Sequence, residues 1–105
     1  MPGETERFDF EGTLFEWNRA KAASNLHKHG VSFGEAATVF GDEDGLLIGD
    51  PDHSEDESRF LLVGRSRLRR LLVVVLVERS ERVRIISARR ATLRERKAYE
   101  EGCQD

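Results

Sequence analysis

The sequence predicts an α+β fold, in which two N-terminal helices pack on a four-stranded antiparallel sheet and a C-terminal helix follows. Residues 71–77 are seven consecutive apolar side chains, four of them valine, which is typical of a buried strand. A short polar turn and a second apolar segment, 83–88, follow directly, so the two segments predict an antiparallel hairpin. Apolar side chains at helical spacing before residue 41, and a helix-start signal at residue 92, predict the helices.

The start of the chain carries few structural signals. Residues 1–13 are polar and predict a flexible N-terminal extension, ahead of a single domain over 14–102 and a tail over 103–105. The apolar side chains within 14–17 also allow a short extra strand before the first helix. A chain of 105 residues has room for one domain with a modest core.

Capping residues bound the two N-terminal helices. Asn18 is a preferred N-cap residue and Gly30 a preferred C-terminal stop, so a first helix runs to about residue 29. Ser32 and Glu35 have the spacing of a capping box, which opens a second helix. Gly41 ends that helix.

The remaining elements complete the predicted sheet. Residues 46–49 form a short strand candidate, and residues 59–65 alternate in a strand-like pattern. Thr92 and Glu95 form a second capping box, which opens a last helix to about residue 101. Because this helix has few apolar residues, we expect it to dock weakly or to serve a partner.

Charge is divided along the chain. The net charge is −3, but residues 1–58 carry −10 and residues 59–98 carry +10. Such separation indicates a local basic surface for an anionic partner. The alternative is that the two halves pack together and neutralise each other, and the charge pattern leaves both open.

The composition also predicts the cellular setting. No apolar run approaches the ~20 residues of a membrane span, and no apolar leader opens the chain, so we expect no membrane association. The single cysteine, Cys103, cannot form an intrachain disulfide, which fits a reducing compartment. We therefore predict a cytoplasmic protein.

Arginines flank the apolar centre of the predicted hairpin at both ends. Guanidinium groups stay charged and bind phosphate through two parallel hydrogen bonds, so arginines on a rigid sheet suit phosphate binding. Arg84 lies inside a strand, where a charged side chain needs a reason; the alternative is an ion pair with Glu78 across the hairpin. The flanking arginines are Arg69, Arg70, Arg79, Arg82, Arg84, Arg89 and Arg90.

These residues favour RNA cleavage without a metal ion. Such cleavage needs a base for the 2′-hydroxyl, an acid for the leaving 5′-oxygen, and cations for the charge that develops on phosphorus. The groups available for proton transfer are His53, Glu78, Lys28 and Tyr99. His53 suits this role by its intrinsic pKa, and a histidine that only hydrogen-bonds within its loop is the alternative.

A metal site has weaker support, and we predict neither metal nor other cofactor. His27 and His29 would point away from each other on a helix and could not share an ion. Asp50, Asp52 and Asp56 offer oxygen ligands for magnesium, although acid-rich loops are usually only solvated.

A set of short motifs follows in one order along the chain. These are residues 15–18 (FEWN), 28–33 (KHGVSF), 52–54 (DHS), 64–66 (GRS) and 84–89 (RIISAR), followed by Ala91, Glu95, Arg96 and Tyr99. Together they resemble the BrnT family of toxins, over residues 15–102, nearly the whole predicted domain. Asn18 departs from the family pattern, which usually has an acid there.

The resemblance implies a RelE-like ribonuclease, the toxin of a type II toxin–antitoxin pair, which cleaves RNA and inhibits growth or translation. It also implies a BrnA-like antitoxin that neutralises the toxin in a 2:2 heterotetramer and alone contacts operator DNA. From the family positions and the chemistry together, the predicted catalytic residues are Arg65, Glu78, Arg84 and His53. The predicted RNA-binding residues are Lys28, His29, Ser87, Arg89, Arg90 and Tyr99.

The main alternative is a catalytically inactive binding module. In that case the basic surface holds an antitoxin-like DNA-binding partner and no reaction follows. Both hypotheses expect such a partner, so complex formation alone does not separate them.

Overall fold

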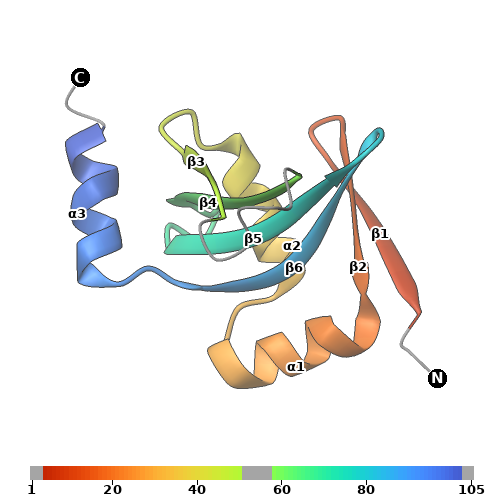
Figure 1. The fold of residues 1–105 in the computed structure, drawn as a ribbon. Helices are drawn as coiled ribbons and strands as arrows, with labels where there is room; N and C mark the ends of the chain where they lie inside the picture. The colour runs from red at the N-terminus through yellow and green to blue at the C-terminus, as the bar shows by residue number, and fades with distance from the viewer. Residues whose placement is uncertain (1–3, 51–57, 103–105) are drawn as a thin grey trace.

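The structure, a computed structural model, describes residues 4–50 and 58–102. Within these residues, six strands form one sheet in the order β1-β2-β6-β5-β4-β3, with α1 and α2 against one face and α3 against the other (Figure 1). The strands are β1 (Thr5–Phe10), β2 (Thr13–Asn18), β3 (Leu46–Gly49), β4 (Arg59–Arg65), β5 (Leu71–Arg79) and β6 (Arg82–Arg90). The helices are α1 (Arg19–His29), α2 (Phe33–Thr38), the 3-10 turn η1 (Val39–Gly41) and α3 (Leu93–Gly102).

The predicted hairpin of β5 and β6 is confirmed, and β5 is buried on both faces. Leu72, Val74 and Leu76 pack in the main core with residues of β2 and α2. Val73 points to the opposite face and packs against Tyr99 of α3. Burying a Val or Leu side chain contributes roughly 1.5–3 kcal/mol, so this strand anchors both sides of the sheet.

The predicted caps at Asn18, Gly30 and Ser32 are confirmed, whereas α2 already ends at Thr38 and the 3-10 turn η1, not α2, extends to Gly41. The Asn18 side chain accepts a hydrogen bond from the Lys21 N–H, and Gly30 ends α1 in the left-handed conformation, at φ 70°. The Ser32 hydroxyl oxygen accepts from the Glu35 N–H at 3.0 Å and so begins α2. Capping satisfies N–H groups that have no partner within the helix, which is why these boundaries were predictable from local sequence.

The predicted four-stranded antiparallel sheet is wrong, although the α+β class holds. A β1–β2 hairpin precedes the helices, and β2 pairs with β6 in parallel, so the six described strands form a mixed sheet. Glu11 and Gly12 both have positive φ, as a two-residue hairpin loop of type I′ requires. No local signal reveals the β2–β6 pairing, because it joins residues more than 60 positions apart.

The predicted flexible extension over residues 1–13 differs from the structure. Most of it belongs to the β1–β2 hairpin, and Phe10 reaches the main core with 8% of its surface exposed. The Trp17 indole N–H donates to the Glu6 carboxylate at 2.9 Å, which ties the two strands together. Residues 1–3 and the predicted tail, 103–105, lie outside the described residues.

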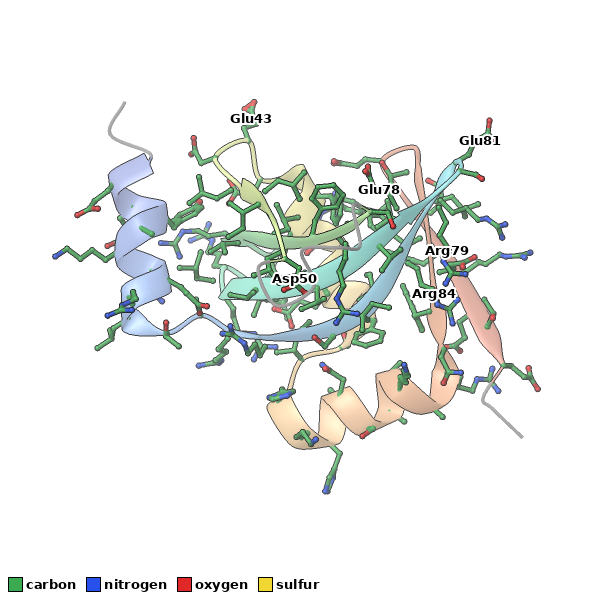
Figure 2. The ribbon with its side chains drawn as sticks, viewed as in Figure 1. Glu43, Asp50, Glu78, Arg79, Glu81 and Arg84 are labelled. Atoms are coloured by element: carbon green, nitrogen blue, oxygen red, sulfur yellow. The ribbon has the colours of Figure 1, made fainter. Side chains whose placement is uncertain are left out.

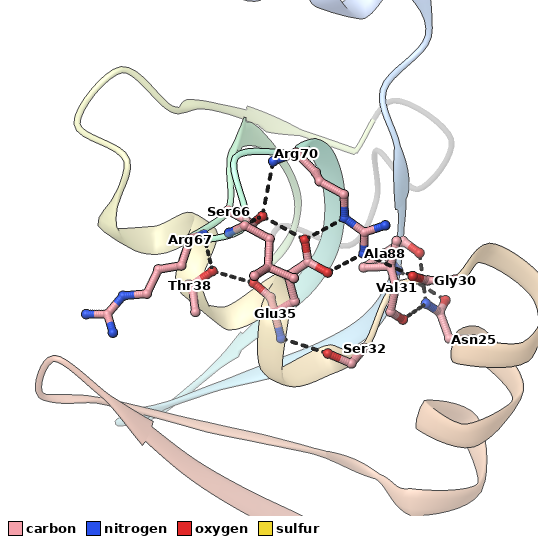
Figure 3. Close-up of polar contacts among 11 residues, drawn as sticks. Asn25, Gly30, Val31, Ser32, Glu35, Thr38, Ser66, Arg67, Arg70 and Ala88 are labelled. Atoms are coloured by element: carbon pink, nitrogen blue, oxygen red, sulfur yellow. Dashed lines mark hydrogen bonds and ion pairs between the residues drawn. The ribbon is translucent and has the colours of Figure 1, made fainter.

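A buried carboxylate fastens α2 to the turn between β4 and β5. Glu35 accepts hydrogen bonds from the Ser66 hydroxyl at 2.7 Å and from two nitrogens of Arg70 (Figure 3). The Arg70 hydrogen bonds hold the pKa of Glu35 below its ordinary value, against the opposing effect of burial. Arg70 also donates to the Gly30 carbonyl at 3.0 Å. Arg70 therefore has a structural role that the sequence did not indicate.

Candidate active site

Three polar side chains of β6 share one face of the sheet, which we call the outer face; among residues 4–50 and 58–102, α3 packs against one end of it. Paired residues of antiparallel strands lie on the same side, so the β5–β6 register assigns these side chains to the face of Val73 and α3. The pairs are Val73 with Arg89, Val75 with Ser87, and Val77 with Arg84.

A β-bulge makes this arrangement possible. In a regular strand, Arg84 and Ser87 would point to opposite faces, because they are three residues apart. The register shifts between Val75 and Leu76 of β5, and Ile86 of β6 has no partner in the ladder. The extra residue turns the strand, as bulges do, and brings Ser87 to the face of Arg84.

Arg84 is held by a buried carboxylate. Its Nη1 donates to one oxygen of Glu16 at 3.0 Å, and Arg82 donates to the other oxygen at 3.0 Å. Glu16 is 5% exposed and lies on β2, the parallel neighbour of β6. The carboxylate partner of Arg84 is therefore Glu16, not Glu78, and two guanidinium groups share one negative charge.

Arg89 makes two parallel hydrogen bonds, both 2.8 Å, to Glu95 at the start of α3. Glu95 also accepts from the Thr92 N–H at 2.8 Å, and the Glu95 N–H donates to the Thr92 hydroxyl oxygen at 3.2 Å, which confirms the predicted capping box. Above all the Arg89 hydrogen bonds lower the pKa of Glu95 to about 2. Glu95 is therefore ionised near neutral pH and orients the Arg89 guanidinium.

Arg65 and Tyr99 meet at the end of the outer face that α3 covers. The Arg65 guanidinium lies over the Tyr99 ring, 5.6 Å from its centre. The Tyr99 hydroxyl donates to Asp42 at 2.6 Å, and the same oxygen accepts from the Arg65 N–H at 2.7 Å. Burial alone would raise the pKa of Asp42, but these hydrogen bonds and that from Asp44 outweigh it, so the pKa is lowered. Tyr99 is thus an anchor of α3.

Ser87 borders a shallow pocket beside α1. The pocket has a volume of about 210 Å³, and Lys28 and His29 of the last turn of α1 line it together with Ile86 and Ser87. The Ser87 hydroxyl makes no hydrogen bond to any of residues 4–50 or 58–102. The structure therefore brings Lys28, His29 and Ser87 together at one pocket, and Ser87 lies between Arg84 and Arg89 along β6.

Five predicted site residues are not part of this group: Arg65 and Tyr99, which meet at the α3 end, and Glu78, Arg90 and His53. Glu78 is exposed and pairs with Val83, which packs on the main core, so it lies on the other side of the hairpin from Arg84 (Figure 2). Arg90 pairs with Leu72 of the main core and faces away from Arg89. His53 lies outside the described residues.

Sequence reasoning missed three residues that position the site: Glu16, Asp42 and Asn25. The buried Asn25 amide donates to the Ala88 carbonyl at 2.8 Å and accepts from the Ala88 N–H at 3.2 Å. It therefore continues the hydrogen bonding of β6 where β2 no longer pairs. Glu16 lies between two aromatic residues of a strand, and that pattern hints at a buried carboxylate but not at its partner.

The described residues offer no evident metal centre. Within 4–50 and 58–102, no three His, Cys, Asp or Glu side chains lie close enough together to hold a metal ion. Asp50 accepts a hydrogen bond from Arg59 at 2.9 Å, whereas Asp52 and Asp56 lie outside the described residues. In the described part of the chain, no helix has the length and apolar character needed to cross a membrane.

Comparison with known proteins identifies the family. A model of the family described as ribonuclease toxin, BrnT, of type II toxin–antitoxin systems matches residues 17–95, which include Arg84, Ser87 and Arg89 but not Glu16 or Tyr99. The chain belongs to the BrnT toxin family. The family match makes it a ribonuclease toxin of a type II toxin–antitoxin system, with an antitoxin as its partner.

A solved BrnT toxin has a similar fold. The crystal structure of the ribonuclease toxin BrnT from Brucella abortus superposes with a TM-score of 0.57, over 72% of this chain and 92% of the other. At 18% sequence identity, this likeness supports the fold and not the individual site residues. A search of curated proteins finds no significant match.

Proposed function

We propose that this BrnT-family chain is an endoribonuclease that cleaves RNA without a metal ion, by attack of the 2′-hydroxyl on the adjacent phosphorus. The observation that carries the proposal is that the bulge places Arg84, Ser87 and Arg89 on the same face of the sheet. Their guanidinium and hydroxyl groups, spread along one strand, suit successive phosphates of an RNA chain.

The reaction forms a bond between the 2′-oxygen and phosphorus and breaks the bond between phosphorus and the 5′-oxygen. A base removes the 2′-hydroxyl proton, and an acid returns a proton to the leaving 5′-oxygen. We assign charge stabilisation to Arg84 and Arg89, and assign proton transfer to His53 or to His29 beside Ser87. Glu78 has no part in this scheme, because it lies across the hairpin from Arg84.

Guanidinium groups that are already fixed in position stabilise the transition state of RNA cleavage more than the ground state. Glu16 and Glu95 fix the Arg84 and Arg89 side chains before RNA arrives, so little ordering is needed during reaction. Arg84 keeps part of its donor set free, because only its Nη1 bonds to Glu16 among the described residues. A phosphate oxygen can therefore bind the rest of the fork.

We further propose that a BrnA-like antitoxin neutralises the toxin in a 2:2 heterotetramer in the cytoplasm, and that operator DNA is contacted only by the antitoxin. Support comes from the type II family match and from the motif resemblance. Growth or translation would be inhibited when the antitoxin is lost.

The deciding experiment is cleavage of end-labelled RNA by the purified chain in EDTA. We expect products with 2′,3′-cyclic phosphate and 5′-hydroxyl ends. Arg84→Lys keeps a positive charge beside Glu16 but loses the planar fork, so we expect cleavage to fall roughly 10²–10³-fold. Arg94→Lys is the matched control on the exposed surface of α3, where cleavage should be unchanged.

Two outcomes would contradict the proposal. Cleavage only after magnesium is added would shift attention to the acidic loop around Asp50. Full activity of a folded Arg84→Lys variant would remove Arg84 from the reaction. The thermal midpoint of each variant shows whether it is folded.

One observation favours the inactive binding module as second candidate. Both Nη atoms of Arg89 already donate to Glu95, so an incoming anion must displace that carboxylate or share the Arg89 guanidinium with it. Absence of cleavage in EDTA, in magnesium and with ribosomes, together with intact antitoxin binding, would support this module.

A further inference from the structure

A second basic site lies at the end of the sheet where β6 leads into α3, and it includes Arg90, which faces away from Arg89. It is a cleft of about 330 Å³ between the β4–β5 turn, the end of β6 and the first turns of α3. Among the described residues that line it, no carboxylate appears. The lining side chains are Arg69, Arg70, Leu71, Arg90, Ala91, Leu93 and Arg96.

Most of the positive charge of this cleft is uncompensated. Glu35 binds Arg70 and so neutralises one of the four arginines, and it also attracts Arg90 electrostatically without forming an ion pair with it. The side chains of Arg69, Arg90 and Arg96 form no ion pair within residues 4–50 and 58–102. Elsewhere in the fold, arginines near carboxylates are paired, as Arg84 and Arg89 are. Three adjacent unpaired guanidinium groups therefore indicate a ligand with several negative charges.

Exposed leucines accompany these arginines. Leu93 lines the cleft and is 85% exposed, and Leu68, in the same turn as Arg69, is 68% exposed. They are the two most exposed large apolar side chains of the described chain. Such side chains cost free energy in water, and grouped beside a charged site they mark protein contact surfaces.

The apolar groups also argue against RNA as the occupant. Proteins that bind single-stranded nucleic acid stack bases on aromatic rings, and the described lining of this cleft contains no aromatic residue. Arginine with leucine suits an acidic peptide that has an apolar side of its own.

We propose that this cleft binds an acidic amphipathic segment of a protein partner, with carboxylates on Arg69, Arg90 and Arg96 and an apolar side chain against Leu93. The identification of the partner as the antitoxin rests on the proposed function. The charge and the apolar side chains of the cleft are observed independently of that function. The site lies at the end of the sheet, beside the helix α3 that covers one end of the outer face, and its lining includes none of Arg84, Ser87 and Arg89.

The test uses the full chain and a fluorescein-labelled 20-residue helical peptide, with leucine at every third or fourth position and glutamate at most others. A peptide of the same composition, scrambled to remove the apolar stripe, is the ligand control. A 2′-O-methyl RNA 20-mer, which lacks the attacking hydroxyl, is the nucleic-acid control. Binding is followed by fluorescence anisotropy at two salt concentrations.

Two variants probe the cleft. We expect Arg96→Glu to weaken peptide binding roughly tenfold or more, because it reverses a charge in the cleft, and Leu93→Ser to weaken it about fivefold. Arg94→Glu makes the same charge change two residues away on α3, outside the cleft lining, and Leu47→Ser removes an exposed leucine on β3. Both controls should bind the peptide as the unaltered chain does.

The result overturns the proposal if the striped peptide fails to bind, if the scrambled peptide binds equally well, or if Arg96→Glu weakens only the binding of RNA. The last outcome would make the cleft a nucleic-acid site. Failure of the proposed function is distinguishable, since a chain without RNA cleavage in EDTA would still bind the peptide.

Discussion

Arg89 and Glu95 are joined by two hydrogen bonds of equal length at the point where β6 leads into α3. The same carboxylate caps the helix through Thr92. One side chain therefore orients a proposed phosphate-binding group and also begins the helix that carries Tyr99. Because the shift of the Glu95 pKa arises first from Arg89, it reports directly on this pair.

The pair predicts acid sensitivity. The pKa of Glu95 is about 2 in the folded chain and about 4.5 when unfolded, so its stabilising effect is complete above pH ~4.5 and is lost as the pH falls towards 2. After discounting for partial exposure of the pair, we expect Glu95→Gln to remove about 1–2 kcal/mol of that pH-dependent stability. The measurement is urea unfolding between pH 2 and 6.

Glu100→Gln, on the exposed side of the same helix, serves as the control. Its pH profile of unfolding free energy should follow that of the unaltered chain. If the Glu95→Gln profile also follows it, the Arg89–Glu95 pair does not contribute to stability in solution.

β6 is the element that decides the geometry of the site. Its first residues pair with β2, its bulge at Ile86 turns Ser87 outward, and its later edge is closed by the amide of Asn25. The edge of a strand otherwise presents unpaired N–H and C=O groups. α1 therefore does more than cover the core, because it supplies the hydrogen bonds that a further strand would make.

Asn25→Asp should destabilise the chain. A carboxylate can still accept from the Ala88 N–H, but it cannot donate to the Ala88 and Val31 carbonyls, and it places a charge in a buried site. We expect a loss of about 2–4 kcal/mol in the free energy of unfolding. Denaturant titration measures this loss.

Asn18→Asp makes the same chemical change at the cap of α1. Aspartate caps helices about as well as asparagine, so the unfolding free energy should change by less than about 0.5 kcal/mol. Equal effects of the two substitutions would show that Asn25 does not close the edge of β6.

At the scale of the molecule, the acidic and basic halves of the chain are interleaved. Most ion pairs among the described residues join a carboxylate before residue 58 to an arginine after it, including those of Glu35 with Arg70 and Glu16 with Arg84. The acidic and basic halves of the chain therefore neutralise much of each other's charge. A local basic surface nevertheless remains at the start of α3. The two hypotheses that the charge pattern left open are both partly right.

The β1–β2 hairpin contributes side chains to the main core. The burial of these side chains predicts how much each one adds to the free energy of unfolding. Phe10 is 8% exposed and packs in the main core, whereas Phe8, on the same strand, is 38% exposed. We expect Phe10→Ala to lower the free energy of unfolding by about 3–4 kcal/mol, and Phe8→Ala by about 1 kcal/mol or less. Comparable small effects at both positions would favour the flexible extension that the sequence indicated.

Local sequence determined much of this protein. The caps at Asn18, Gly30 and Ser32, the buried run of β5 and the hairpin with β6 follow from interactions within a few residues. The motif segments were sufficient for the family as well. Arg84 and Arg89 could be named as phosphate-binding candidates because arginine chemistry does not depend on the fold.

Tertiary structure alone decided how these parts meet. The parallel pairing of β2 with β6, the Glu16 partner of Arg84 and the Asp42 partner of Tyr99 join residues 57 to 68 positions apart. The bulge that turns Ser87 to the face of Arg84 depends on which residues of β5 lie opposite. Contacts of this kind depend on the packing of the whole chain, so periodicity and spacing within one segment carry no record of them.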